Sequence, residues 1–295
     1  MSYEQSKDLI LQLEEITNTQ VFFLASPISN GLDTVLMRLI SETKDDKRPV
    51  TLVLHTSGGS ADIGISIIKV LKAHGKKVTV AVYRKCMSAG TIMALAADKI
   101  LMGKYAYLGP VDGQITVGNY ESVSVNAIGD ILGRTDIPNA LEPLLVGSYE
   151  ESLIYKENIL YPIVLKHCKN NEVIARSLLD FLVSRGHHTY NIFYNEAKSI
   201  GFNVKKMPSD MEHVIEKLIF LAEDEMNFFR ADRALSYWDI GKINEANTFQ
   251  TPDIVGAIFQ NSKACWEHKH AYIAAIANGN VKSFQTRCEW QKTDF

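Results

Sequence analysis

The amino-acid sequence predicts an α/β fold that continues into a mainly helical C-terminal region. In the first half of the chain, short β-rich runs alternate with helical patterns, and the connections between them are short. This rhythm is typical of α/β proteins. Beyond about residue 145, the apolar positions follow a largely helical pattern.

The elements expected in the first half follow one another in a regular order. Residues 50–55 (VTLVLH) form a near-continuous apolar run, which is typical of a strand buried on both faces of a sheet. A helix follows and ends at Gly75, because glycine commonly terminates helices. The full expected series is a strand over 20–25, a helix over 31–42, a strand over 50–55, a helix over 61–74, a strand over 77–83, a short helix ending at 97, and strands over 99–102 and 105–108.

The composition excludes several classes of protein. The 295 residues are 46% hydrophobic and 22% charged, with a net charge of -3, which is ordinary for a globular protein. Since there is no basic excess, we expect no nucleic-acid partner. No apolar run approaches the ~18 residues of a membrane span, and the polar N-terminus lacks the pattern of a signal peptide. The four scattered cysteines predict reduced thiols, so we expect a cytoplasmic protein.

Two turns in the first half combine residues that suit acyl-transfer chemistry. The first follows the 50–55 strand and contains Gly58 and Gly59, and about thirty residues later Ser88 stands at a strand-to-helix junction. Amides at a helix N-terminus favour negative charge, and glycines let a backbone approach a ligand closely. The amides of Gly58 or Gly59 and of Ala89 are therefore expected to form an oxyanion hole beside a Ser88 nucleophile.

Each turn taken alone has a simpler structural interpretation. A serine at such a junction commonly caps the helix, and a glycine pair commonly serves only to turn the chain. Neither turn has the spacing of a phosphate-binding loop. The two turns together at this spacing are far less generic, and this pairing favours the catalytic interpretation.

The stretch from Val50 to Gln114 resembles the ClpP/crotonase superfamily. Within that superfamily it is most similar to the serine dehydrogenase proteinase family, which is related to signal peptide peptidase A. The most specific parts of the match are the runs MSAGT, ALAADKI and LGPVDGQ. The resemblance covers about residues 20–205. We therefore expect a catalytic domain over 1–205 and a helical region of unknown role over 206–295.

A second, weaker likeness begins at residues 186–192 (GHHTYNI) and continues to Glu196-Ala197 and Gly201. The sequence departs from the family pattern there, because Thr189 and Asn191 replace an aspartate and a proline. The resemblance as a whole implies a spiral of ββα units and a serine peptidase that forms an acyl-enzyme without a cofactor or metal. It also implies a homo-oligomer that acts on peptide or protein substrates.

A serine hydroxyl becomes a good nucleophile only when a base takes its proton. Relatives of the Clp proteolytic subunit carry a histidine about 25 residues after the serine, but Gly113 stands there in this chain. No histidine lies between Ser88 and His167. This favours a Ser–Lys dyad, as in signal peptide peptidase A, in which burial must keep the lysine neutral.

Lys156 is the lysine that best fits this requirement. It lies where the serine dehydrogenase proteinase family carries a lysine, and its spacing puts it on an apolar helical stripe. That stripe consists of Leu153, Lys156, Leu160 and Ile163. Pro162 interrupts the same helix and predicts a kink. Lys85 and Lys104 are the alternative bases, although both are flanked by turn or β segments that favour exposure.

Several further residues have a structural and a functional interpretation. His55, at the end of a buried strand, is expected to make a structural hydrogen bond rather than to contact substrate. Asp112 could position the lysine or a water, although a turn-capping role competes with it. Cys86 belongs to the strand that leads into the Ser88 turn, so it is not the expected nucleophile. The C-terminal set Cys265, His268, His270 and Cys288 has the spacing of no common zinc module, so we expect no metal.

Two other functions compete with a serine peptidase. In a crotonase-like acyl-CoA enzyme, the same oxyanion hole would hold a thioester enolate, but the MSAG turn puts a serine where that branch usually has no nucleophile. An inactive scaffold or binding protein of the same fold is the second alternative, since the C-terminal part of the chain matches no pattern that we recognise.

Overall fold

The structure is a computed structural model of the 295-residue chain. It describes residues 3–116, 122–124, 128, 142–184, 190–226, 249–250, 254–277 and 280–293.

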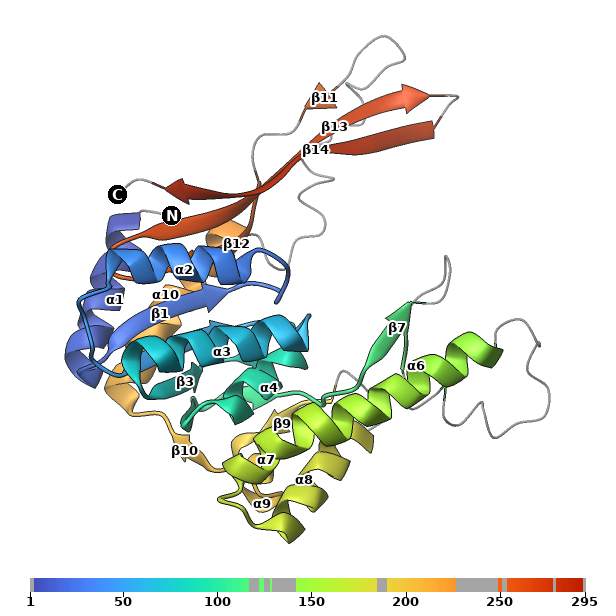
Figure 1. The fold of residues 1–295 in the computed structure, drawn as a ribbon. Coiled ribbons are helices and arrows are strands. Elements are labelled where there is room, and N and C mark those ends of the chain that lie inside the picture. Colours follow the sequence, from blue (N-terminus) through green and yellow to red (C-terminus); the bar gives the residue numbers. More distant parts are fainter. Residues whose placement is uncertain are drawn as a thin grey trace.

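A large mixed sheet runs through the molecule (Figure 1). Its first five strands are parallel to one another, and β12 joins them antiparallel to β1. In spatial order the strands are β10 (Val204–Lys206), β5 (Lys99–Met102), β3 (Val78–Val82), β2 (Val50–His55), β1 (Gln20–Ala25), β12 (Ile254–Gln260), β13 (Cys265–Ala277) and β11 (Phe249–Gln250), while β14 (Asn280–Thr293) pairs with β13. Every residue of β1 and β2 is buried, which explains their near-continuous apolar sequences.

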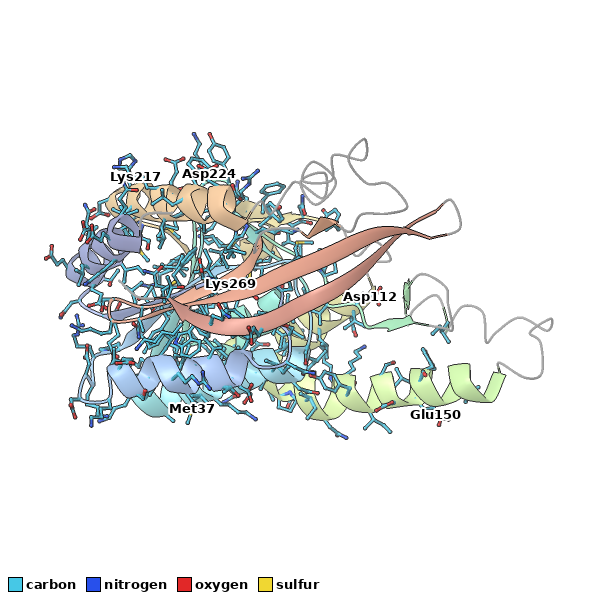
Figure 2. The ribbon with its side chains drawn as sticks, turned by 90° about the horizontal axis from the view of Figure 1, so that it is seen from above. Met37, Asp112, Glu150, Lys217, Asp224 and Lys269 are labelled. Atoms are coloured by element: carbon cyan, nitrogen blue, oxygen red, sulfur yellow. The ribbon has the colours of Figure 1, made fainter. Side chains whose placement is uncertain are left out.

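Helices cover the sheet on both faces. One face carries α2 (Leu32–Glu42), α3 (Ala61–Gly75) and α4 (Ala89–Ala96), and alternate strand residues such as Leu52 and Leu54 join their hydrophobic core. The opposite face carries α1 (Tyr3–Thr17) and α10 (Ser209–Met226), which pack on Phe23 and Val53. Figure 2 shows Lys217 and Asp224 of α10 on the opposite side of the molecule from Met37 of α2.

The strands alternate between this sheet and a smaller one, as expected for a spiral of ββα units. The strands β4 (Lys85–Cys86), β6 (Tyr107–Leu108) and β9 (Ile192–Phe193) form the small sheet. Thus β3 lies in the large sheet, β4 lies in the small sheet, and α4 follows them. A two-stranded ribbon consists of β7 (Gln114–Thr116) and β8 (Ser122–Ser124).

A helical layer packs beside α4. It contains α6 (Glu142–Tyr155), the π-helical turn η1 (Lys156–Leu160), α7 (Tyr161–His167), α8 (Glu172–Ser184) and α9 (Tyr194–Ser199). The N-terminal part of α6 extends away from the body of the molecule (Figure 1). The segment just before Pro162 is a π-helical turn, in which the Tyr161 N–H donates to the carbonyl of Lys156. The kink expected at Pro162 stays a prediction.

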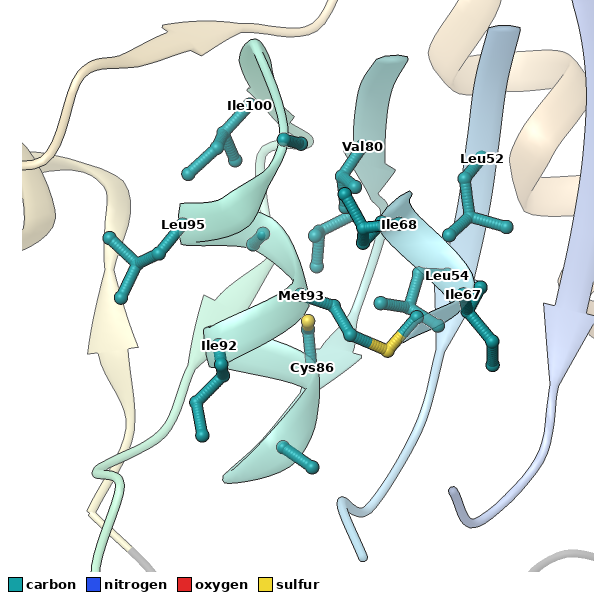
Figure 3. Close-up of a cluster of buried hydrophobic side chains, with 14 of the residues drawn as sticks. Leu52, Leu54, Ile67, Ile68, Val80, Cys86, Ile92, Met93, Leu95 and Ile100 are labelled. Carbon is teal, nitrogen blue, oxygen red and sulfur yellow. The ribbon is translucent and has the colours of Figure 1, made fainter. Parts of the chain in front are cut away.

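The core between α3, α4 and the sheet fixes the start of α4. Met93 points from α4 toward Leu54 and Ile67, and Cys86 lies beside it (Figure 3). Ile92 and Leu95 point the other way (Figure 3) and line a small apolar cavity with Leu160 of η1. The helix that begins next to Ser88 is therefore buried along seven of its eight residues.

The expectation of a mainly helical C-terminal region is wrong for its last part. The region is helical through Met226, but the described residues beyond it form the strands β11 to β14. Residues 284–291 of β14 (FQTRCEWQ) alternate apolar or β-branched residues with polar ones, a pattern that favours a strand, whereas β12 (IVGAIFQ) carries no such alternation. Buried hydrogen bonds join the C-terminal residues to the N-terminal half, among them Ser6 with Gln260 and Asn261 Nδ2 with the Leu39 carbonyl. The division at residues 205 and 206 stays a prediction.

Candidate active site

Ser88 occupies a strained backbone position at the start of α4. Its φ of 49° and ψ of -115° lie outside the regions that residues with a side chain usually adopt. Such strain costs on the order of 1–3 kcal/mol and is found most often at functional sites. The Ser88 side chain is half-buried, makes no capping bond to α4, and has no hydrogen-bond partner among the described residues. A helix cap is therefore not the role of this hydroxyl.

The glycine turn lies directly against Ser88. Gly58 has a φ of 105° and Gly59 a φ of 134°, which L-residues with a side chain rarely adopt. A Cβ on Gly58 would lie 2.7 Å from the Ser88 Cβ and 3.4 Å from its Oγ. A Cβ on Gly59 would lie 2.2 Å from the carbonyl oxygen of Ile28. Both positions thus require glycine, and the nearest atom that a Cβ on Gly58 would meet belongs to Ser88.

The amides of this region differ in whether they are already bonded. The Gly58 N–H donates to Thr56 Oγ1 at 3.1 Å, so it is engaged inside the turn. The amides of Gly59 and Ala89 have no acceptor among the residues that the structure describes, and Ala89 is the first residue of its helix. Of the three amides expected for an oxyanion hole, these two have the N–H available.

The bonding partner of Gly58 was missed in the sequence. Thr56 is fully buried and holds the glycine turn through its hydroxyl. A threonine whose hydroxyl accepts a bond from the amide two residues later is a recognised turn pattern, so a local signal was present.

Lys156 lies at the first residue of the π-helical turn, with its side chain 22% exposed. Its Nζ pairs with Asp180 Oδ1 of α8 at 2.9 Å. The expected apolar stripe is only partly buried, because Leu160 lies in the core whereas Leu153 is 44% exposed. In this structure Lys156 therefore pairs with a carboxylate at the edge of the helical layer.

The backbone around Lys156 is nevertheless anchored near both turns. The hydroxyl of Tyr155 donates to Asp62 Oδ1 at 2.9 Å, and Asp62 lies in the first turn of the helix that follows Gly59. On the other side, Leu160 lines a cavity with Ile92, which belongs to the first turn of α4. Lys156 thus lies between two contacts. One reaches α3, which begins after the glycine turn, and the other reaches α4, which begins after Ser88.

The alternative lysines have other surroundings. Lys85 is a half-buried residue of β4, and its carbonyl accepts the N–H of Thr56 at 3.0 Å. Lys104 is exposed; its N–H donates to Glu212 Oε1 of α10, and its ammonium lies 5.0 Å from the ring centre of Tyr105.

His55 belongs to the opposite face of the sheet from the Ser88 helix. It is 1% exposed, and burial, together with the positive charges of Arg84 and Lys85, lowers its pKa to about 4. Its Nε2 lies 3.6 Å from Glu223 Oε1, and the two groups form an ion pair only when the histidine is protonated. Burial raises the pKa of Glu223, which also accepts hydrogen bonds from Arg84 at 3.1 and 3.2 Å.

Asp112 is buried in the turn that follows the small sheet, and Figure 2 shows it close to the β7 ribbon. Two neighbours of Asp112 anchor this turn. The Gly109 N–H donates to the carbonyl of Cys86 at 3.2 Å, and the Val111 N–H donates to that of Leu182 at 2.9 Å. The Thr91 hydroxyl donates to the Gly109 carbonyl at 2.8 Å. The turn therefore braces the start of α4 against α8.

Within the described residues, no group of three His, Cys, Asp or Glu side chains is arranged to hold a metal ion. No described helix combines the length and apolar character needed to cross a membrane. Cys86 and Cys168 are free thiols, and burial raises the pKa of Cys86 above its ordinary value. Of the second, weaker likeness to the family, which begins at residue 186 and continues to Gly201, residues 186–189 lie outside the described residues.

Comparisons with known proteins show what the chain is similar to. Residues 19–227 match the family described as ClpP-like SDH-type serine proteinase. Two uncharacterized proteins of Methanocaldococcus jannaschii are 33% and 31% identical over 183 residues, which cover 61% of this chain and 62% and 60% of theirs. The ATP-dependent Clp protease proteolytic subunit 1 of Chlamydia pneumoniae is 26% identical over 119 residues, 36% of this chain and 62% of that protein. The chain thus spans less than two thirds of the length of each of these relatives.

Among solved structures, a mutant of the 1510-N membrane-bound stomatin-specific protease matches with a TM-score of 0.42 and 17% identity, over 68% of this chain and 84% of that one. The family match covers the five parallel strands of the large sheet, both turns of the candidate site and the π-helical turn that carries Lys156, and it ends before β11 to β14. This chain belongs to the ClpP-like SDH-type serine proteinase family.

Proposed function

We propose that the protein is a serine peptidase in which Ser88 attacks the peptide bond and Lys156 is the general base. The observation that carries the proposal is the strained conformation of Ser88, whose hydroxyl lies near Gly58 and has no hydrogen-bond partner within the described part of the chain. The available amides of Gly59 and Ala89 support it, because an acyl-transfer site needs donors for the oxyanion that forms next to the nucleophile.

The reaction follows from these positions. Ser88 Oγ attacks the carbonyl carbon while its proton passes to neutral Lys156, and the carbonyl oxygen becomes an oxyanion that accepts bonds from Gly59 and Ala89. When the carbonyl re-forms, the C–N bond breaks and the leaving amine takes the proton from Lys156. Lys156 then takes a proton from water, the hydroxide attacks the acyl-enzyme, and Ser88 leaves with that proton restored.

For this role the ammonium of Lys156 must leave Asp180 and turn toward Ser88. The pair costs little to break, since Asp180 is 63% exposed and exposed ion pairs contribute only about 0–1 kcal/mol. Substrate binding beside the turn would also exclude water and favour the neutral lysine. We infer that an extended peptide is the substrate, because Ser57 and Gly59 are exposed residues of the turn beside which a strand-like peptide would pair. Assembly into a homo-oligomer remains part of the proposal.

Peptide hydrolysis by the wild type and by Ser88→Ala tests the nucleophile. We expect Ser88→Ala to lower kcat/KM by at least about 10⁴-fold, as when a catalytic serine is removed from other hydrolases. Ser60→Ala is the matched control, because Ser60 caps α3 with its Oγ 3.4 Å from the Ile63 amide. This control should lose about 1 kcal/mol of stability and keep its activity within about fivefold. Hydrolysis that survives Ser88→Ala would refute the assignment.

A further inference from the structure

Thr56 lies between the glycine turn and the strand that leads to Ser88. It directly follows β2 and is fully buried. Its N–H donates to the carbonyl of Lys85 at 3.0 Å, and its carbonyl accepts the N–H of Met87 at 3.2 Å. Thr56 therefore pairs in parallel with Cys86 and joins the end of β2 to the last residues before Ser88.

The two branches of the Thr56 side chain reach two different parts of the site. The hydroxyl accepts the Gly58 N–H at 3.1 Å. The methyl group packs against Gly90, the second residue of α4, where an added Cβ would lie only 2.5 Å from Thr56 Cγ2. One side chain thus bonds the turn on one side and supports the nucleophile helix on the other.

Neither branch can be removed without a specific loss. Valine keeps the shape but leaves the buried Gly58 amide without its acceptor. Serine keeps the acceptor but leaves a methyl-sized gap beside Gly90. Because the hydroxyl acts on the turn and the methyl acts on the helix, the two substitutions separate the two contacts.

We propose that Thr56 is a positioning residue that sets the place of the oxyanion amides relative to Ser88. The inference rests on the proposed function. Thr56 acts through Gly58 and Gly90, and its own side chain is buried away from any substrate. Its contribution is therefore to the geometry of the transition state, and its loss lowers kcat while KM stays unchanged.

Steady-state kinetics of Thr56→Val and Thr56→Ser test this role. Thr56→Val should lower kcat about 10- to 100-fold with KM within about twofold, because a misplacement near 1 Å costs on that order. Thr56→Ser should restore kcat to within about threefold of the wild type. Thr51→Val is the matched control: Thr51 is a buried threonine at the other end of β2, bonded to Thr19 at 2.8 Å, and its loss should leave kcat unchanged.

Amide hydrogen exchange of the 57–60 segment supplies a readout that is independent of activity. Exchange at Gly58 should become faster in Thr56→Val and stay slow in Thr56→Ser. If exchange rises while kcat stays at the wild-type value, or if Thr56→Ser loses as much kcat as Thr56→Val, the positioning role is refuted. If the wild type shows no Ser88-dependent hydrolysis, the proposed function fails and the catalytic role of Thr56 fails with it. This holds even if faster exchange in Thr56→Val shows that the Thr56 hydroxyl protects the Gly58 amide.

Discussion

Ser88 and Lys156 lie on neighbouring helical segments, yet the fold holds the two residues in different ways. Ser88 is held by its backbone, which is strained, pressed against Gly58 and followed by a buried helix. Lys156 is held by its side chain, which pairs with a mostly exposed carboxylate. The comparison shows that packing determines the position of the proposed nucleophile, whereas the base depends on a contact that costs little to change.

Among these tests, substitution of Lys156 should have the largest effect on kcat. Lys156→Ala should lower kcat about 10²- to 10⁴-fold, which is the usual contribution of a general base. The free energy of unfolding should change by less than about 1 kcal/mol, because the ion pair that is lost involves the mostly exposed Asp180. Lys104→Ala and Lys85→Ala serve as controls and should keep kcat. If Lys156→Ala keeps full activity and kcat falls strongly in Lys85→Ala or Lys104→Ala, the lysine substituted in that variant is the base instead.

Gly58→Ala tests the surroundings of Ser88. Compared with Lys156→Ala, it should lower kcat less and lower the free energy of unfolding more. The new Cβ would lie 2.7 Å from the Ser88 Cβ at a φ of 105°, so the turn or the serine must shift. We expect kcat to fall about 100-fold and the free energy of unfolding to fall by about 2 kcal/mol.

Gly147→Ala is the matched control for that change. It lies in α6, and an added Cβ would meet nothing within 4 Å. Alanine there should raise the free energy of unfolding by about 0.5–1 kcal/mol through helix propensity and leave kcat unchanged. Equal stability and activity in Gly58→Ala and Gly147→Ala would contradict the close contact between Gly58 and Ser88.

The sequence predicts the nucleophile side better than the base side for a physical reason. Glycines with positive φ and a serine at a strand-to-helix junction are local requirements, so the two turns at Gly58, Gly59 and Ser88 could be predicted from the sequence, while their catalytic roles stay a prediction. The pair between Lys156 and Asp180 joins two helices and depends on a rotamer, which no local pattern specifies. The C-terminal strands were missed because β12 is held by pairing with β1, more than 220 residues away.

Acid should weaken the contact between α7, which follows the Lys156 turn, and α4, which follows Ser88. Burial lowers the pKa of His167 to about 4, and this neutral ring accepts the Asn203 N–H at 2.9 Å and also bonds the backbone of Leu95 in α4. The unfolded chain binds a proton near pH 6.5, whereas the folded chain does so only near pH 4. The unfolded state therefore binds more protons in this window, and the free energy of unfolding falls as the pH is lowered through it.

Urea unfolding at several pH values measures this effect. His55 has the same lowered pKa, so each of the two histidines should remove up to about 3 kcal/mol between pH 6.5 and pH 4. His167→Asn should flatten the pH dependence, while substitution of the exposed His213 by glutamine should leave it unchanged. A slope that is identical in all three proteins would contradict the buried neutral state of His167.

The central claim is that Ser88 is the nucleophile, and the site of a covalent adduct tests it most directly. The wild-type protein and Ser88→Ala are treated with a serine-directed phosphonate, digested and mapped by mass spectrometry. We predict one adduct on the wild-type peptide that contains Ser88, and none in Ser88→Ala. An adduct on another residue, or equal labelling of Ser88→Ala, would contradict the claim.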